Sequence, residues 1–432
     1  MVEPAGFFFH VLFWWRRRIV TIRLYRLVIQ ETLKVVPTVP RIRVVFSIGA
    51  LHGGGSERQI VSALRHLGRE QFEPHLYLVY RSGPLLSCVP DDVAVTAFDE
   101  RDTRAPTAIP GGMHRRRVED MQRYLEEVQA DVCYDRTFLM TLVAADASQR
   151  LGIPNISTIV TDPSSGFAPV AGRFQRLKRW TLRRLYSRSA LVLAVSHGAA
   201  RSAEQFYGLK LHTVATHYNG IDVEAVRQAS RQSIDSRWWN AAAQDKSSVV
   251  RIVSAGRLNH EKGFHLLVNA VAKLERESSD TEYRLVLLGE GQHRVQLQSQ
   301  IDAVGLTEQV HLAGFQDNTA AWYRSADVFV LPSLVEGMPN VLLEAMACGT
   351  PVVSSRCPHG PEEVLEDGRF GLLCETGSVT ALTNSIRDII SNPQAAKTRA
   401  AAAEFRVKSS FDQRQAIRRL QDFFSMVIQG KE

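Results

Sequence analysis

From residue 41 onward, short β-branched runs alternate with amphipathic helical stretches. Strands are expected at 42–47, 75–79, 132–134, 156–160 and 191–195, and again at 251–255, 284–288, 310–313, 328–331 and 351–354. This alternation indicates βαβ units, whose strands pair in parallel sheets. A polar stretch over 224–248 has no convincing strand and separates the two series. The chain is therefore expected to fold into two doubly wound α/β domains.

The length and composition of the chain fit this organisation. At 432 residues it is too long for one ordinary core, and 45% apolar with 22% charged residues is typical of a globular enzyme. We divide the chain into an N-terminal extension (1–40), a first domain (41–222), a linker or peripheral segment (223–248), a second domain (249–410) and a final amphipathic helix (411–432). The first helix is expected to open with a capping box at 56–59.

The five cysteines are scattered along the chain, and no two of them have the close spacing of metal ligands. Their odd number and their spacing argue against a zinc site and against a disulfide scaffold. We therefore expect reduced thiols in a cytoplasmic setting.

The net charge of +7 is concentrated in two segments. Residues 1–35 hold six basic and two acidic residues, and residues 173–188 hold seven basic residues and no acid. Apolar residues interleave both segments, a mixture that favours helices lying in the headgroup plane of a membrane. A nucleic acid is another possible anionic partner, and the second segment is equally consistent with a solvated helix face.

The apolar run that opens the chain is about nine residues long before three arginines interrupt it. A bilayer-spanning helix needs about 20 apolar residues, so this run is not expected to span a membrane. It does not look like a secretory signal either, because the positive residues follow the apolar run.

The most informative motif runs from Glu336 to Glu344. Pro339 suits the first turn of a helix, so the helix should begin between the two acids. Free N–H groups of Asn340 and Val341 at that start can bind a phosphate. Carboxylates beside a diphosphate need hydroxyls to accept from, which makes a sugar ring and a ribose sensible partners for the two glutamates. The alternative is an ordinary strand–loop–helix with one capping and one surface acid.

Two further loops follow predicted strands. Arg257 and Lys262 flank a short loop that leads into a helix, and two converging cations suit a diphosphate leaving group. In the first domain, Gly54 and Gly55 give a strand-to-helix turn that a phosphate or sugar can approach closely. The alternatives are a pair of solvated cations and a tight turn with no ligand.

Taken together, residues 54–58, 256–263, 325–328, 336–353 and 360–373 resemble family 4 glycosyltransferases, and the resemblance extends in order over 41–425. It implies a GT-B fold, with two Rossmann-like domains facing each other across a cleft. It also implies transfer of a sugar with retained anomeric configuration, with no metal and no other cofactor. The final helix would cross back to the first domain.

The same resemblance implies roles for individual residues. Glu336 would contact hydroxyls of the donor sugar and support the reacting centre, Glu344 would hold the ribose, and Arg257 and Lys262 would hold the diphosphate. The remaining donor-binding positions would be Gly54, Gly55, Gly337, Met338, Asn340 and Val341, with the backbone N–H groups of the last three contacting the diphosphate.

The resemblance also suggests the substrates. By analogy the donor is a nucleotide sugar, with uridine diphosphate the favoured nucleotide and a hexose or N-acetylhexosamine the favoured sugar. The acceptor would be lipid-linked or a glycan, in polysaccharide or glycoconjugate biosynthesis. We expect a peripheral protein at the inner face of the membrane, with no nucleic-acid partner.

The acceptor side departs from the family pattern. Many relatives have a histidine where this chain has Thr161-Asp162-Pro163. Asp162 is a candidate proton acceptor, although an aspartate before proline commonly forms a turn. His197, at the end of a predicted strand, is the second candidate, with a structural histidine as the alternative.

Three other functions are alternatives to a glycosyltransferase. A dinucleotide-dependent oxidoreductase would use the loop at 289–294, where Arg294 replaces the third glycine of the usual pattern. A non-catalytic scaffold would bind membrane or nucleic acid through the basic segments alone. A sugar-nucleotide epimerase or a phosphorylase of similar architecture would leave the acceptor-side features without a purpose.

Overall fold

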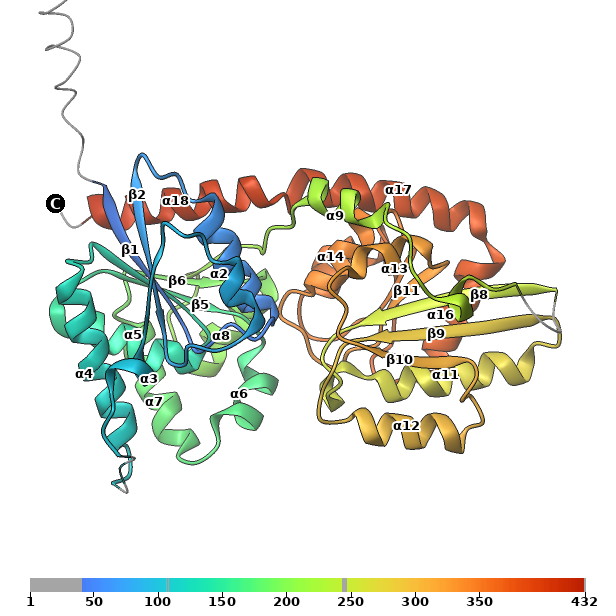
Figure 1. Ribbon diagram of the computed structural model, residues 1–432, viewed down its shortest axis with the longest axis horizontal. Helices are drawn as coiled ribbons and strands as arrows, with labels where there is room; N and C mark the ends of the chain where they lie inside the picture. Colours follow the sequence, from blue (N-terminus) through green and yellow to red (C-terminus); the bar gives the residue numbers. More distant parts are fainter. Residues whose placement is uncertain (1–40, 106, 108, 243–246, 431–432) are drawn as a thin grey trace, which may run out of the picture. The chain divides into compact units, whose positions relative to one another are not determined.

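The structure is a computed structural model that describes residues 41–105, 107, 109–242 and 247–430 (Figure 1). The extension predicted over 1–40, with its basic and apolar sequence, lies outside these residues. The chain from Arg43 to Leu67 and from Pro74 onward forms one compact unit, and Arg41, Ile42 and Gly68–Glu73 belong to a second, smaller group. In that smaller group, the N–H of Ile42 donates to Gln71 O at 2.8 Å.

Within the described residues, the first sheet has seven strands in the order β3-β2-β1-β4-β5-β6-β7. The strands are β1 (Ile42–Ile48), β2 (Phe72–Leu78), β3 (Ala94–Ala97), β4 (Val132–Arg136), β5 (Asn155–Ile159), β6 (Leu191–Ala194) and β7 (Val214–Thr216). β4 pairs in parallel with β1 and with β5. The strand order reverses between β1 and β4, and ligands of such sheets bind outside the carboxyl ends of the strands at this point.

Helices connect these strands, as parallel pairing requires. They are α2 (Gly55–His66), α3 (Phe98–Arg101), α4 (Gly112–Glu127), α5 (Phe138–Leu151), α6 (Pro163–Ala171), α7 (Gln175–Tyr186) and α8 (His197–Tyr207), with a 3₁₀ turn at Pro84–Cys88. The capping box predicted at 56–59 is shifted. Gly54 is the N-cap of α2, and its own N–H donates to the Glu57 carboxylate. Because glycine has no side-chain oxygen, only this half of the box forms.

The second sheet has six strands among the described residues, in the order β10-β9-β8-β11-β12-β13. They are β8 (Ser248–Ala255), β9 (Thr281–Leu288), β10 (Val310–Gly314), β11 (Val328–Leu331), β12 (Val352–Ser355) and β13 (Leu372–Cys374). Its helices are α11 (Phe264–Glu277), α12 (Arg294–Ala303), α13 (Thr319–Ser325), α14 (Asn340–Ala347), α15 (Pro361–Val364), α16 (Val379–Ser391) and α17 (Pro393–Ser410). All of its strand pairs are parallel, and here the order reverses between β8 and β11.

The expected fold class of two parallel-sheet α/β domains is confirmed. The sequence predicted every interior strand and missed β3, β7 and β13. These three are edge strands of three or four residues. Such short runs carry too little periodicity to stand out, and an edge strand has only one neighbour to select its residues.

The polar segment over 223–248 contains two helices, α9 (Val223–Ser230) and α10 (Arg237–Asn240). Trp239 of α10 is fully buried, lies 5.4 Å from the ring of Trp322, and donates from Nε1 to Ser325 Oγ at 2.9 Å. Arg284 donates to the carbonyl of Trp238 at 2.6 Å. A buried tryptophan and a buried arginine therefore attach this segment to the second domain.

The last helix, α18 (Gln413–Gln429), buries Ile417, Leu420, Phe424 and Val427 along one face. The ring of Phe424 lies 5.8 Å from the rings of Phe46 in β1 and Tyr134 in β4. The helix that ends the chain therefore packs on the first sheet.

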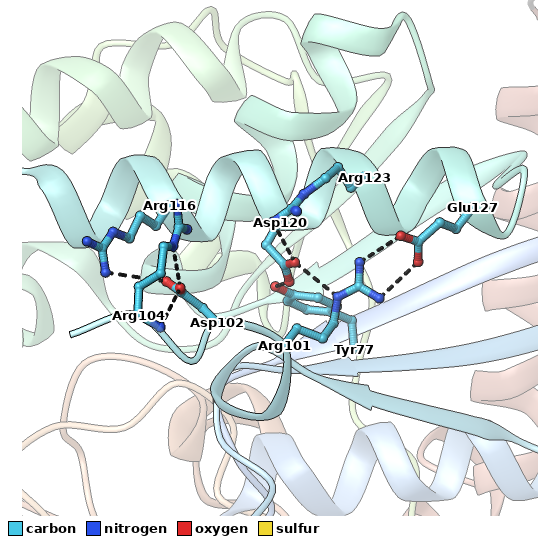
Figure 2. A network of polar contacts seen from close by, with 8 residues as sticks. All are labelled: Tyr77, Arg101, Asp102, Arg104, Arg116, Asp120, Arg123 and Glu127. Carbon is cyan, nitrogen blue, oxygen red and sulfur yellow. Dashed lines mark hydrogen bonds and ion pairs between the residues drawn. The ribbon is translucent and has the colours of Figure 1, made fainter. Parts of the chain in front are cut away.

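A buried carboxylate joins α4 to the first sheet (Figure 2). Asp120, 1% exposed, accepts from Tyr77 Oη at 2.8 Å, Arg101 Nε at 3.0 Å and Arg123 Nη2 at 3.2 Å. Arg101 also forms two hydrogen bonds with Glu127. Burial, and then the Asp120 charge, raise the pKa of Tyr77, so its hydroxyl stays a donor.

We predict that Asp120→Ala lowers the free energy of unfolding by about 2–3 kcal/mol, because it leaves the buried Tyr77 hydroxyl without its acceptor. The matched control is Asp146→Ala, which removes the more exposed helix-surface pair with Arg150 and should cost at most about 1 kcal/mol. Urea denaturation measures both. Equal losses would show that the Asp120 network adds no more than a surface ion pair.

Candidate functional site

The reversal point of the second sheet brings together two segments that are far apart in sequence. The chain leaves β8 toward Lys262 and leaves β11 toward Glu336, and these two strands are paired neighbours. Lys262 Nζ lies 2.6 Å from Glu336 Oε1, and Ser333 Oγ donates to the same oxygen at 2.7 Å. The two charged side chains are only 20% and 8% exposed. Two of the predicted residues thus form a largely buried ion pair.

Backbone contacts explain why Lys262 reaches Glu336. Gly263 has φ +67°, and a Cβ there would lie 2.0 Å from Pro332 O. Only glycine allows the loop after β8 to pack so closely on the end of β11. The N–H of Leu334 then donates to Glu261 O at 2.8 Å, which fixes the two loops together. On its other side, Glu336 is held by its N–H, which donates to Pro358 O at 2.9 Å.

Arg257 lies on the same loop with an exposed side chain. Among the described residues, no ion pair joins it to Glu336 or Glu344. The glycines of the loop at 289–294 support this region. A Cβ at Gly289 would lie 2.1 Å from Gly256 O, and one at Gly291 would lie 2.6 Å from Leu258 O. These glycines pack against the loop that carries Arg257, which explains the superficial likeness to a dinucleotide loop.

Helix α14 begins at Asn340, one residue later than predicted. Pro339 is its N-cap residue rather than the first helical residue, because its ψ of 91° is not helical. Asn340 and Val341 are therefore the first residues of the helix, and their N–H groups have no partner within it. Met338 is buried in the apolar core of the second domain. Gly337 lies so close to Val160 that a Cβ there would be 2.3 Å from Val160 O.

The glycine turn of the first domain lies beside the start of α14. A Cβ at Gly55 would lie 3.1 Å from Asn340 Nδ2. Gly55 is the first residue of α2, so two helix N-termini meet at this point, and such ends favour anions. The N–H of Gly54 is already taken by Glu57, which leaves Gly55 as the better donor of the two glycines.

Glu344 lies one turn further along α14. Tyr323 Oη donates to Glu344 Oε2 at 3.4 Å. Burial raises the pKa of Glu344, and the charge of Arg58 opposes the rise. Arg58 belongs to the first turn of α2, so a cation of the first domain contributes to the environment of this acid. Glu336 and Glu344 flank the start of α14, as the spacing predicts, and each has its own partners.

Asp162 is the N-cap of α6. Its side chain accepts from Ser164 N at 3.0 Å, Ser164 Oγ at 2.6 Å, Ser165 Oγ at 2.5 Å and the hydroxyl of Ser202. Burial alone would raise its pKa, but these hydrogen bonds outweigh burial and lower the pKa to about 2. A carboxylate that is saturated with donors and this acidic is a poor proton acceptor. We therefore do not retain Asp162 as a catalytic base.

His197, the first residue of α8, is exposed, and its Nδ1 lies 2.8 Å from Thr216 Oγ1. Its backbone N–H donates to Glu363 Oε2 at 3.0 Å, and Gly198 N–H donates to the same oxygen at 3.4 Å. Tyr218 Oη donates to Glu363 as well. Glu363 therefore caps α8, and the structure places His197 at this cap. Among the described residues, neither a hydrogen bond nor an ion pair joins His197 to Lys262 or Glu336.

Three polar residues of the site region escaped the sequence analysis. Ser333 supports Glu336, Asn219 donates from Nδ2 to Asn340 Oδ1 at 2.9 Å, and Arg136 donates from Nη2 to Asn219 Oδ1 at 2.8 Å. Ser333 and Arg136 stand at or just after the carboxyl end of a buried strand, where polar residues interrupt apolar ones. That position is a usable signal in doubly wound sheets.

Two family models match consecutive parts of the chain. Residues 53–225 match the model described as Glycosyltransferase Family 4, and residues 240–406 match the model described as Glycosyl transferases group 1. The fold and these two matches together identify the protein as a glycosyltransferase. The chain belongs to the family 4, group 1 glycosyltransferases, which confirms the resemblance and leaves the oxidoreductase alternative without support.

Curated relatives share part of the chain. An N-acetylgalactosamine-N,N'-diacetylbacillosaminyl-diphospho-undecaprenol 4-alpha-N-acetylgalactosaminyltransferase of Campylobacter jejuni is 30% identical over 225 residues, which are 52% of this chain and 57% of that protein. Glycogen synthase of Mycobacterium tuberculosis is 29% identical over 289 residues, 65% of each chain. The chain thus matches between about half and two thirds of the length of these relatives.

Among solved structures, Anabaena HepE in complex with UDP and glucose is similar, with a TM-score of 0.73 and 22% identity over 89% of this chain and 100% of that one. This similarity supports the assignment of the fold as two parallel-sheet α/β domains. Within the described residues, no helix is both long enough and apolar enough to cross a bilayer.

The low pKa of Asp162 has a consequence for stability. A carboxylate whose pKa is lowered by folding stabilises the protein above its unfolded pKa of about 4, and this contribution is lost as the pH falls toward 2. From these two pKa values, we predict that wild type loses about 1 kcal/mol more than Asp162→Asn between pH 5 and pH 3. Urea titrations at each pH measure this difference. Loss of sugar transfer by Asp162→Asn, with parallel pH profiles of stability, would instead favour a role as base.

Proposed function

We propose that this protein transfers a sugar from a UDP-sugar to a lipid-linked or glycan acceptor in polysaccharide or glycoconjugate biosynthesis, with retention of anomeric configuration. The observation that carries the proposal is the contact between Lys262 and Glu336 at the reversal point of the second sheet. The relatives support the substrates: the Campylobacter jejuni enzyme is named for a diphospho-undecaprenol-linked acceptor, and HepE has been seen with UDP and glucose. An epimerase or a phosphorylase is the alternative.

In the proposed reaction, the bond between the sugar C1 and the diphosphate oxygen breaks, and its electron pair goes to the diphosphate. The acceptor oxygen bonds to C1, and the proton of the acceptor hydroxyl passes to the departing diphosphate oxygen. Lys262, Arg257 and the N–H groups that open α14 would stabilise the negative charge that develops on the diphosphate. These groups would supply the positive charge themselves, so we propose that the reaction needs no metal ion and no other cofactor.

Glu336 would bind the donor sugar and stabilise the reacting carbon. Its Oε1 already accepts from Lys262 and Ser333, and no partner of Oε2 is found among the described residues. Oε2 would therefore accept from a donor-sugar hydroxyl, while the negative charge of the carboxylate would stabilise positive charge at C1. Glu344, one turn further along α14, would accept from the ribose hydroxyls. Whether the sugar is a hexose or an N-acetylhexosamine is tested by the donor panel below.

We also propose that the protein binds an anionic membrane surface through α7 and meets its acceptor there. Four apolar side chains form a stripe along α6 and α7: Val170, Phe174, Leu177 and Trp180. They are 57–59% exposed, and their spacing of four, three and three residues places those on α7 on one face. The opposite face of α7 buries Leu182, Leu185 and Tyr186 in the domain core. The helix is therefore anchored on one side and apolar on the other.

The basic residues near this stripe indicate that its partner is an anionic surface. The sequence segment 173–188, which contains three of these four side chains, holds seven basic residues and no acidic residue. Several of them are partly engaged, since Arg179 donates to Phe206 O and Lys178 to Ala171 O. Arg176, Arg184 and Arg188 remain exposed. Apolar side chains among cations favour the interface of a bilayer with anionic headgroups, which takes up both kinds of group.

For the catalytic proposal, we predict that Glu336→Gln lowers transfer by about 10²- to 10³-fold, because the neutral amide cannot stabilise charge at the reacting carbon. The assay uses labelled UDP-glucose, UDP-galactose and their N-acetylhexosamine counterparts, with and without undecaprenyl-diphosphate-linked sugars, and identifies the products. The exposed Glu308→Gln is the matched control and should keep full activity. Undiminished transfer by Glu336→Gln would refute its role, and a new UDP-sugar isomer formed without acceptor would favour the epimerase.

For the docking proposal, we predict that the double substitution Leu177→Ala and Trp180→Ala weakens binding to phosphatidylglycerol-containing vesicles at least about tenfold, because two apolar anchors worth more than 1.4 kcal/mol together are lost. Phe405→Ala, at a phenylalanine on α17 that is 73% exposed against 59% for Leu177 and Trp180, is the control and should bind like wild type. Vesicle cosedimentation gives the affinities. Equal binding of both variants, or equal binding of wild type to purely zwitterionic vesicles, would contradict α7 docking.

A further inference from the structure

Arg136 is a buried cation at the reversal point of the first sheet. It ends β4, the strand that pairs with β1, and β1 leads into the glycine turn at Gly54 and Gly55. The residue is only 4% exposed. No carboxylate of the described residues forms an ion pair with it, and its Nε is buried without a hydrogen-bond partner among them.

The hydrogen-bond partners of Arg136 among the described residues are neutral. Its Nη1 donates to Tyr134 Oη at 3.2 Å, and that hydroxyl also accepts from Thr158 at 3.1 Å. Burial, and then the charges of Arg136 and Arg419, lower the pKa of His217 to about 3, so this neighbour is uncharged at neutral pH. A buried guanidinium that lacks a counter-charge is costly, and proteins seldom keep one without an anion nearby.

The second contact of Arg136 leads toward the donor site. Arg136 Nη2 donates to Asn219 Oδ1 at 2.8 Å, and because the guanidinium can only donate, this contact fixes which end of the Asn219 amide is the oxygen. Asn219 Nδ2 must then donate, and it does so to Asn340 Oδ1 at 2.9 Å. The Nδ2 of Asn340 is then directed toward Gly55. A Cβ built on Gly55 would lie 3.1 Å from this nitrogen.

This series of contacts places an N–H donor between two helix N-termini. Asn340 opens α14 and Gly55 opens α2, and both ends favour negative charge. If the Asn340 amide were turned over, its oxygen would face the same point and would repel an anion. The orientation of one amide therefore decides whether this point attracts or repels a phosphate, and Arg136 determines that orientation from a buried position.

We propose that Arg136 is a positioning residue for the donor diphosphate: acting through Asn219, it orients the Asn340 amide to donate to a phosphate oxygen. The negative charge of the bound diphosphate compensates the buried guanidinium. This inference rests on the proposed function, and it adds an anion-binding element from the first domain to the cations of the second.

The test compares stability with ligand affinity in Arg136→Met, using UDP and inorganic pyrophosphate as probes. Removal of an uncompensated buried cation should leave the melting temperature of the free protein unchanged or raise it. The affinity for both probes, measured by calorimetry, should fall about tenfold. Arg284→Met is the matched control, because Arg284 is also buried but pairs with Glu282 at 2.6 Å. It should lower the melting temperature and leave both affinities unchanged.

A second variant keeps the proposal testable if Arg136→Met fails to fold. Asn219→Asp keeps the shape of the side chain and still accepts from Arg136, but it cannot donate to Asn340 Oδ1. It should weaken binding of both probes about tenfold in the wild-type background and have no further effect in an Asn340→Ala background. Unchanged affinity in Arg136→Met, or additive effects of Asn219→Asp and Asn340→Ala, would overturn the proposal.

The outcomes separate this inference from the proposed function. If wild type binds pyrophosphate but not UDP, the nucleotide assignment fails, and the loss of pyrophosphate binding in Arg136→Met still supports the positioning role. If wild type binds UDP and Arg136→Met binds it equally well, the positioning role fails while the donor assignment stands.

Discussion

The ion pair between Lys262 and Glu336 is the contact on which the rest of the site depends. It forms because β8 and β11 are adjacent where the strand order of the second sheet reverses, so that the loops leaving them meet. Gly263 lets the two loops touch backbone to backbone, and Ser333 fixes the carboxylate. Lys262 and Ser333 hold one oxygen of the largely buried Glu336 carboxylate, which leaves the other oxygen for the hydroxyl of a sugar in the proposed complex.

The start of α14 extends this arrangement toward the first domain. Asn340 lies beside Gly55, where two helix ends meet, and Glu344 lies one turn further, within the influence of Arg58. The start of α14 thus offers N–H donors, Lys262 supplies a cation beside Glu336, and Glu336 and Glu344 lie on either side of this helix start. This distribution suits a nucleotide sugar, whose charge is central and whose hydroxyls lie at both ends.

Sequence reasoning succeeded where local pattern carries the information. The interior strands, the start of α14 within one residue and the placement of Glu336 and Glu344 around it follow from strand composition and helix-end preferences. It failed for the short edge strands. It also could not show that Asp162 is an N-cap saturated by serines, one of which is Ser202, forty positions away. Asn219 and Arg136 stayed hidden for the same reason, because their significance comes from contacts with Asn340, distant in the sequence.

The most direct measurement is the affinity for UDP, by calorimetry, of wild type, Lys262→Met and Glu336→Gln. UDP carries the diphosphate but no sugar, so it separates the two members of the ion pair. The account predicts that Lys262→Met weakens UDP binding at least about tenfold, and that Glu336→Gln binds UDP as tightly as wild type or more tightly because a negative charge is removed. UDP binding that is unchanged in Lys262→Met, or that is lost in Glu336→Gln, would contradict it.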